Sequence, residues 1–193
     1  MSRMSSFNFR SPLIFVDLEM SGPDPQLHQI TEISAIKCDP KNFGVLDQFG
    51  YRFKAVAGKT PEQVIKEAHP VALEKTGLRA QDLEFGLTPE EGIRKFKEWL
   101  PNSYIFVGYN LMLDFMFLRK SCNPEVKFNY RFVDVSSIAE LYYAEDSRQD
   151  TRISYSLHNL ARSLGIPYEN AHNSLDDALL VLEVFKKMLK NLE

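Results

Sequence analysis

The hydrophobic pattern of this 193-residue chain changes its period after Lys54. Up to that point the apolar residues form short runs that are continuous or alternate with polar residues, as they do in β-strands. They predict three strands, at residues 13–16, 30–37 and 47–54. Because the segments between them are short, we expect these strands to form an antiparallel meander.

Beyond Lys54 the pattern is mainly that of amphipathic helices. Pro61 and Pro89 stand where a helix has its first turn, and Thr88 with Glu91 has the spacing of a capping box. The pattern predicts helices from residue 60 and over 88–100, 111–120, 134–143, 156–164 and 174–192, strands at 104–107 and 132–133, a turn at His69-Pro70 and a charged loop at 145–152. A meander followed by helix-linked strands predicts a mixed α/β sheet with helices packed on it.

The composition is that of a soluble globular protein, with 44% apolar and 25% charged residues. The length suits a single domain, expected at residues 12–193 after a polar, disordered lead-in at 1–11. No apolar stretch approaches the ~18 residues of a membrane-spanning helix, and the lead-in lacks the apolar core of a secretion signal. Cys38 and Cys122 have neither disulfide-framework nor metal-ligand spacing, so we expect reduced thiols and a cytoplasmic location.

Two carboxylates, Asp17 and Glu19, end the first apolar run. On a strand, residues two apart project from the same face, so these side chains would lie side by side. An ordinary core does not hold unpaired like charges, and a divalent cation would resolve the conflict. The alternative is that both residues mark the point where the strand reaches solvent.

A third carboxylate, Asp114, stands in a helical stretch made almost entirely of large apolar residues. Asn110 precedes it by four residues, which places both on one side of the helix entry, with Asn110 as a candidate cap. A charged residue in such surroundings is either an isolated solvent-facing position or a ligand. The alternative is a polar first turn favoured by the helix dipole.

His172 and Asp177 stand at the start of the last predicted helix. Asp177 lies off the apolar stripe of that helix and could either bind a metal ion or form a capping box with Ser174. Histidine side chains ordinarily titrate near neutral pH, which makes His172 a natural proton acceptor, or it is an ordinary exposed histidine. His158, in the preceding helix, is expected on the helix surface.

Together these residues supply four carboxylates and one histidine. Such a set suits two hard divalent cations with a general base, and that chemistry hydrolyses phosphodiester bonds. The net charge of −3 provides no basic field over the whole surface, but a site that grips only a few nucleotides needs positive charge only locally.

The order, spacing and flanks of these residues resemble the three motifs of the DEDDh 3′–5′ exonucleases, in segments 15–22, 107–118 and 172–177. The resemblance covers about residues 13–188 and implies a ribonuclease-H-like α/β fold, a five-stranded mixed sheet flanked by helices. It implies that two Mg²⁺ or Mn²⁺ ions are bound by Asp17, Glu19, Asp114 and Asp177. It also implies that His172 deprotonates the attacking water, and that the backbone near Met20 and the side chain of Asn110 hold the terminal nucleotide.

The implied reaction is hydrolysis at the 3′ end of single-stranded DNA or RNA, with release of nucleoside 5′-monophosphates. Segments 17–22 and 129–136 resemble oligoribonuclease, whereas 108–118 and 156–166 resemble the proofreading exonucleases of bacterial DNA polymerase III. An oligoribonuclease-like enzyme for short RNA therefore stays open, as does an inactive nucleic-acid-binding module. The sequence also leaves open DNA against RNA, substrate length, and a homodimer or an association with a polymerase.

Overall fold

The computed structural model describes residues 7–121, 128–129, 131–143, 156–168 and 173–191. The described strands form one five-stranded sheet in the order β3-β2-β1-β4-β5. Three of them are antiparallel neighbours: β1 (Leu13–Met20), β2 (Ile30–Cys38) and β3 (Val45–Arg52). The other two are parallel additions, β4 (Ile105–Gly108) beside β1 and β5 (Phe132–Asp134) beside β4. The predicted meander and mixed α/β sheet are confirmed.

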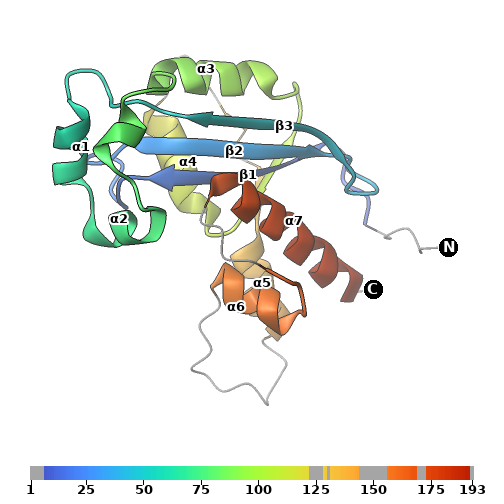
Figure 1. Ribbon diagram of the computed structural model, residues 1–193. Helices are drawn as coiled ribbons and strands as arrows, with labels where there is room; N and C mark the ends of the chain where they lie inside the picture. The colour runs from blue at the N-terminus through green and yellow to red at the C-terminus, as the bar shows by residue number, and fades with distance from the viewer. Residues whose placement is uncertain (1–6, 122–127, 130, 144–155, 169–172, 192–193) are drawn as a thin grey trace.

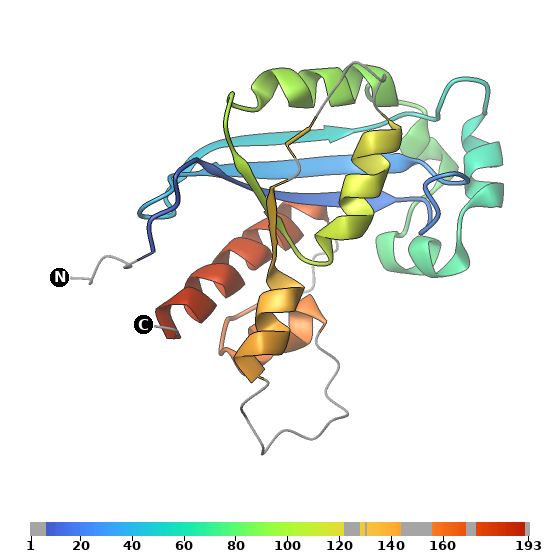
Figure 2. The ribbon, with the colours of Figure 1, turned by 180° about the vertical axis from the view of Figure 1, so that it is seen from behind.

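Helices cover both faces and one end of this sheet (Figures 1 and 2). One face carries α7 (Ser174–Asn191), with α5 (Val135–Tyr143) and α6 (Leu157–Ser163) packed beside it. The opposite face carries α3 (Pro89–Trp99) and α4 (Leu111–Lys120). At one end of the sheet lie α1 (Pro61–Glu67) and α2 (Pro70–Thr76), followed by a short 3₁₀ helix at Ala80–Leu83.

Each face of the sheet has its own apolar cluster, because side chains alternate between the faces along β1. Phe15 faces α7 and packs against Phe185, with ring centroids 5.5 Å apart. Ile14 faces the other way and belongs to the cluster that contains Phe96 of α3 and Phe117 of α4. The alternation continues beyond Phe15, and it sets which face the acidic residues of β1 occupy.

β1 extends further than the apolar run predicts. It ends at Met20 rather than near Val16, because β2 continues to pair with it through Glu32 and Ile30. Asp17 and Glu19 therefore lie within the strand, on the face that also carries Phe15 and that α7 covers.

The turn predicted at His69 and Pro70 is instead the start of α2. Pro70 occupies the first helical position, and Val71 N–H donates a hydrogen bond to His69 Nδ1 at 3.3 Å. A histidine cap followed by proline gives a helix start that the composition did not distinguish from a turn.

The lead-in at residues 1–11 and the domain at 12–193 stay predictions, because residues 1–6 are outside the described part of the chain. At the described end of this segment, Phe9 N–H donates to Pro40 O at 3.0 Å, and its ring lies 6.0 Å from those of Phe43 and Phe185. The loop predicted at 145–152 also falls outside the described residues. Among the helices that are described, none has the length and apolar character needed to cross a bilayer.

Candidate active site

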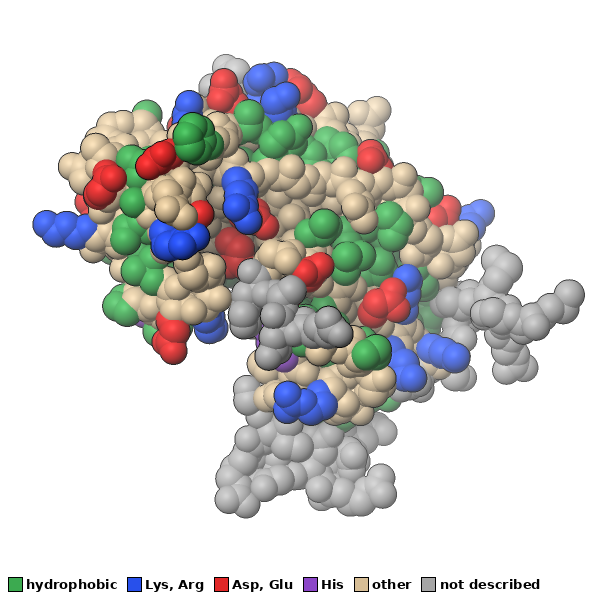
Figure 3. Space-filling model, in the orientation of Figure 1, with side chains coloured by type: hydrophobic (Ala, Val, Ile, Leu, Met, Phe, Trp, Pro, Cys, Tyr) green, Lys and Arg blue, Asp and Glu red, His purple; other side chains and the backbone are tan. Residues whose placement is uncertain are grey.

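Three of the predicted ligands meet on the α7 face of the sheet. Asp17 and Glu19 project from β1, and Asp177 projects from the first turn of α7. One carboxylate oxygen of each lies within 4.8 Å of those of the other two. Figure 3 views this side of the molecule and shows acidic side chains in a hollow, with lysine and arginine side chains at its rim. The fold thus brings together residues from the first strand and the last helix.

Burial and mutual repulsion oppose ionisation of these carboxylates when no cation is bound. Burial raises the pKa of Asp17 well above its ordinary value, and the charges of Asp114 and Glu19 raise it further. Burial also raises the pKa of Glu19 to about 7, with a further contribution from Asp177. The protein itself therefore leaves this negative charge undercompensated, and an oxygen-rich cluster of that kind suits a hard divalent cation.

Asp114 approaches the cluster from α4, on the other side of β1. It is buried, and its Oδ1 accepts a hydrogen bond from Leu18 N–H at 3.1 Å. β4 pairs with β1 only as far as Phe15, so the edge of β1 is open beyond it, and Asp114 satisfies one of the exposed N–H groups. Burial raises the pKa of Asp114, as it does that of Asp17. Asp114 lies beside the cluster but outside the group whose oxygens are mutually within 4.8 Å.

The entry to α4 is held by Asp134 at the end of β5. Its two carboxylate oxygens accept hydrogen bonds from Asn110 N–H and Leu111 N–H, each at 3.1 Å. Asn110 has φ 55° and its side chain makes no capping hydrogen bond, so the predicted cap is wrong. At Gly108 an added Cβ would lie 3.0 Å from Val16 O, so glycine allows β4 to end close against β1. The role of Asn110 in nucleotide binding stays a prediction.

The first turn of α7 is capped by Asn173 and Asp176, not by Ser174 and Asp177. Asp176 N–H donates to Asn173 Oδ1 at 2.9 Å, and Asn173 Nδ2 donates to Asp176 Oδ2 at 2.6 Å. Asp177 is one residue further on and faces the cluster instead. His172, the predicted base, lies outside the described residues, so its role stays a prediction.

Two aromatic side chains to which the sequence analysis gave no role in the site contact Asp177. His158 Nε2 lies 3.5 Å from Asp177 Oδ1, and Tyr168 O–H donates to the same oxygen at 3.4 Å. The two rings stack with centroids 4.4 Å apart. The His158 side chain is only 31% exposed, so a plain surface position is the wrong interpretation. This contact depends on how α6 packs beside α7, and no local sequence signal predicts it.

Glu32 is a further carboxylate near the cluster that the sequence analysis left without a role. It stands directly opposite Glu19 in the β1–β2 pairing, and its own partners are Arg52 and Ser174. A signal was present, because Glu32 is a carboxylate between Ile30 and Ile33 in a predicted strand.

With this geometry in view, comparison with known proteins decides the family. The sequence model of the exonuclease family RNase_T matches residues 14–185. The chain belongs to this family. The RNase_T exonuclease chain is 30% identical over 138 residues to oligoribonuclease from Vibrio cholerae, covering 67% of this chain and 74% of that protein. The resemblance drawn from the motifs is thus confirmed at the level of the superfamily.

Two other proteins that the RNase_T exonuclease chain matches are much longer. PolC-type DNA polymerase III from Thermotoga petrophila is 28% identical over 188 residues, which are 96% of this chain and 12% of the polymerase. The zinc-bound form of the exonuclease I–single-stranded DNA complex from E. coli matches with a TM-score of 0.78 and 19% identity, over 96% of this chain and 41% of that one. This likeness confirms the expected ribonuclease-H-like fold. The chain spans less than half the length of either protein.

Proposed function

We propose that this chain is a metal-dependent 3′–5′ exonuclease that releases nucleoside 5′-monophosphates from the 3′ ends of single-stranded DNA or RNA. The observation that carries the proposal is the convergence of Asp17, Glu19 and Asp177, which are distant in sequence, on one face of the sheet. Family membership supports the same class of reaction. A purely nucleic-acid-binding module would gain nothing from a cluster of carboxylates that repel both one another and phosphate.

The proposal includes two divalent cations, Mg²⁺ or Mn²⁺, held by Asp17, Glu19, Asp177 and the adjacent Asp114. These residues fit such ions because all of them are carboxylates, the ligands that hard cations prefer, and because burial and neighbouring carboxylates oppose ionisation of Asp17 and Glu19 without a cation. When bound, the ions would activate water and stabilise negative charge on the phosphate. His172, in the segment before α7, is proposed to accept the proton from that water.

A hollow beside Glu19 supports a place for the base of the terminal nucleotide. It has a volume of about 290 Å³. Its apolar lining includes Met20, Pro23, Val71, Ala72 and Leu113. A base has two apolar ring faces, which such a lining accommodates without regard to sequence. We propose that Met20, which lines this hollow, and Asn110, at the start of α4, hold the terminal nucleotide.

A second candidate is an oligoribonuclease-like enzyme that degrades short RNA. The match to V. cholerae oligoribonuclease over 74% of its length favours it, whereas the PolC-type match covers only 12% of the polymerase. The two candidates use the same chemistry and differ in the length and sugar of the substrate.

A substrate panel with purified protein and Mn²⁺ tests both candidates. Single-stranded DNA and RNA, each of two and of about thirty nucleotides, carry a 5′ label, with parallel reactions in EDTA. We expect a ladder that shortens from the 3′ end and nucleoside 5′-monophosphates as products. Preference for the dinucleotides of RNA would select the second candidate.

The matched variants for this panel are Asp17→Asn and Asp39→Asn. Asp39 lies in an exposed turn, where its Oδ1 accepts hydrogen bonds from Lys41 N–H and Asn42 N–H. Asp17→Asn should lower the rate by at least about 100-fold, since even residues that only support metal ligands are worth 10–100-fold. Asp39→Asn should leave the rate unchanged. The proposal fails if no substrate is shortened in Mn²⁺, or if Asp17→Asn digests as fast as the wild type.

We also propose a cytoplasmic location, supported by a buried thiol at Cys38 and by the lack of disulfide spacing in the sequence. Fractionation of cells that express the tagged chain tests it. A homodimer and an association with a polymerase are the partner arrangements to examine. Light scattering after size-exclusion chromatography measures the first, and co-purification from the source cells measures the second.

A further inference from the structure

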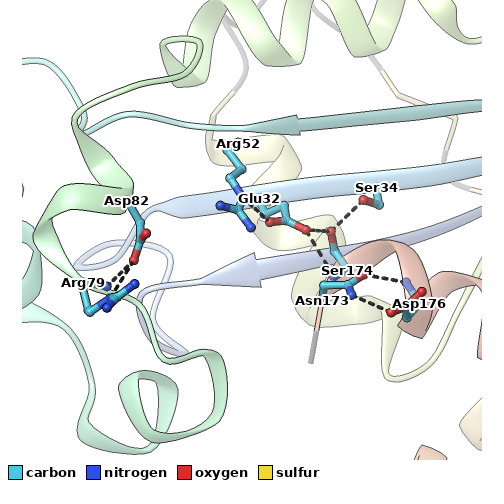
Figure 4. A network of polar contacts seen from close by, with 8 residues as sticks. All are labelled: Glu32, Ser34, Arg52, Arg79, Asp82, Asn173, Ser174 and Asp176. Carbon is cyan, nitrogen blue, oxygen red and sulfur yellow. Dashed lines mark hydrogen bonds and ion pairs between the residues drawn. The ribbon is translucent and has the colours of Figure 1, made fainter. Parts of the chain in front are cut away.

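The carboxylate of Glu32 joins three elements next to the proposed metal site (Figure 4). In the sheet it stands between Glu19 of β1 and Arg52 of β3, directly opposite each. Its Oε2 accepts a hydrogen bond from Arg52 Nε at 3.1 Å. Its Oε1 accepts hydrogen bonds from the start of α7, from Ser174 Oγ at 2.6 Å and Ser174 N–H at 3.3 Å.

We propose that Glu32 is a positioning residue for the exonuclease reaction, an inference that rests on the proposed function. It holds the first turn of α7 against β2, so that Asp177 stays beside Asp17 and Glu19. Glu32 does not itself bind the cations in this proposal, because both of its oxygens are occupied by hydrogen-bond donors.

The hydrogen bonds of Glu32, together with the contact between Ser174 and Ser34, link α7 to the sheet at this point. The Asn173–Asp176 pair also fixes the first turn, but it is internal to that turn and does not bind it to a strand. Ser174 is fully buried, and its Oγ lies 2.7 Å from Ser34 Oγ on β2. The N–H of Ser174 lies at the start of α7 and has no acceptor within the helix. The Glu32 carboxylate supplies that acceptor, and its negative charge is stabilised by the positive end of the helix dipole.

The register of the strands explains how this contact sets the position of Asp177. Ser34 is directly opposite Asp17 in the β1–β2 pairing. Asp177 follows Ser174 by three residues, so the two share one side of the helix. With Ser174 fixed over β2, Asp177 is brought over β1, where the other two carboxylates project. A displacement of about 1 Å in such a group costs on the order of 100-fold in rate.

Placing Glu32 opposite Glu19 has a cost, because like charges directly across a strand pair repel. Arg52 and Ser174 offset this cost with a positive charge and two donors. An apolar residue would avoid the repulsion but would leave Ser174 without its acceptor, so the residue at this position is best explained by the hydrogen bonds that it accepts.

The deciding variants are Glu32→Ala, which removes the acceptor, and Glu32→Gln, which keeps a carbonyl acceptor for Ser174 without the charge. The control is Glu98→Ala, because Glu98 is an exposed glutamate that pairs with Arg94 at 2.8 Å on α3. At saturating Mn²⁺ we expect Glu32→Ala to lower kcat by about 10–100-fold with little change in KM. Glu32→Gln should stay within about threefold of the wild type, and Glu98→Ala should equal it.

A second measurement does not depend on turnover. Hydrogen exchange of the backbone amides at 174–178 in metal-free protein should be faster in Glu32→Ala and unchanged in Glu32→Gln and Glu98→Ala. Asp177 N–H, which donates to Asn173 O at 3.1 Å, reports directly on the first turn. If Glu32→Ala does not fold, Ser174→Ala decides, and it must show both faster exchange and a lower kcat.

Full turnover by folded Glu32→Ala, or unchanged exchange in its first turn, would overturn the inference. So would a Glu32→Gln variant as slow as Glu32→Ala, since the charge and not the hydrogen bonds would then matter. If the wild type digests nothing, the proposed exonuclease is wrong, and the exchange measurement still decides whether Glu32 holds α7.

Discussion

At the scale of single residues, the site places carboxylates where burial and mutual repulsion oppose their ionisation. Asp17 and Glu19 are adjacent on one face of β1, and Asp177 is packed against them. Burial raises the pKa of Asp17 and of Glu19, and the neighbouring carboxylates add to both shifts. In the metal-free protein these groups therefore hold protons that ordinary surface carboxylates have released.

This property predicts a pH dependence of stability in EDTA. The pKa of Glu19 rises from 4.5 to about 7 on folding, so folded protein binds more protons than unfolded chain between these values. The stability from this group is present below pH 4.5 and is lost as the pH rises through about 7. We expect the Tm to fall by a few degrees from pH 5 to pH 8, at about 2–4 °C for each kcal/mol.

Differential scanning calorimetry of the wild type and Glu19→Gln measures this effect, with Glu98→Gln as the control. Glu19→Gln should reduce the fall in Tm, whereas Glu98→Gln should not. Mn²⁺ should restore stability at pH 8 in the wild type, because a bound cation favours the ionised carboxylates. Equal pH slopes for the wild type and Glu19→Gln would contradict the prediction.

At the scale of elements, short polar contacts fix where α4 and α7 begin, and the start of each of these helices places a proposed ligand. Asp134 holds the start of α4, which carries Asp114. Glu32 holds the start of α7, which carries Asp177. Asp134 lies on β5, which pairs with β4, and Glu32 lies on β2, which pairs with β1. The pairing of the strands therefore determines where these two helices begin.

Asp134→Ala should therefore affect both stability and activity. It removes the acceptor for Asn110 N–H, Leu111 N–H and Ser136 N–H. We expect the free energy of unfolding to fall by about 1–3 kcal/mol, as measured by urea denaturation. Turnover should fall as well, because Asp114 lies in the first turn that these bonds hold.

The control for this prediction is Asp39→Ala. Asp39 also accepts backbone hydrogen bonds, from Lys41 N–H at 2.8 Å and Asn42 N–H at 3.0 Å, but in an exposed turn that positions no ligand. The Asp39→Ala variant should therefore have a lower free energy of unfolding and the same turnover as the wild type. Equal turnover in Asp134→Ala and the wild type would show that the start of α4 does not control Asp114.

The elements that could be predicted from sequence are those whose signals are local. The alternating pattern predicted the strand that contains Phe49, and Thr88 with Glu91 predicted the start of α3, where the capping box is present. The spacing of Asp17 and Glu19 predicted that they share a face. The contacts of Glu32 with Ser174 could not be predicted, because they join residues 142 positions apart through helix packing.

At the scale of the whole molecule, the sheet separates the apolar cluster under α3 and α4 from the cluster under α7, which lies on the face that carries Asp17, Glu19 and Asp177. Asp114 reaches the site from α4, on the first of these faces. Phe96 belongs to the cluster under α3 and α4, whereas Phe185 of α7 belongs to the cluster on the face that carries the carboxylates. Both side chains are almost fully buried, at 0% and 1% exposed, so the two faces can be perturbed to the same extent.

Phe96→Ala and Phe185→Ala should each lower the free energy of unfolding by about 3–5 kcal/mol. The two variants should differ in the activity of their folded fraction. Phe96→Ala should keep its turnover at temperatures where it is folded, while Phe185→Ala should lose turnover because α7 carries Asp177. Denaturation curves and initial rates at low temperature measure both quantities. Loss of turnover in Phe96→Ala alone would contradict this division of the fold.

The proposed ligand set draws on the first strand and the last helix of the described fold, which has a consequence during protein synthesis. A nascent polypeptide still lacking α7 holds Asp17 and Glu19 but not Asp177. We expect such an unfinished product to be hydrolytically silent, even with its meander already formed. Premature termination in this region would then yield a fragment without an assembled metal site.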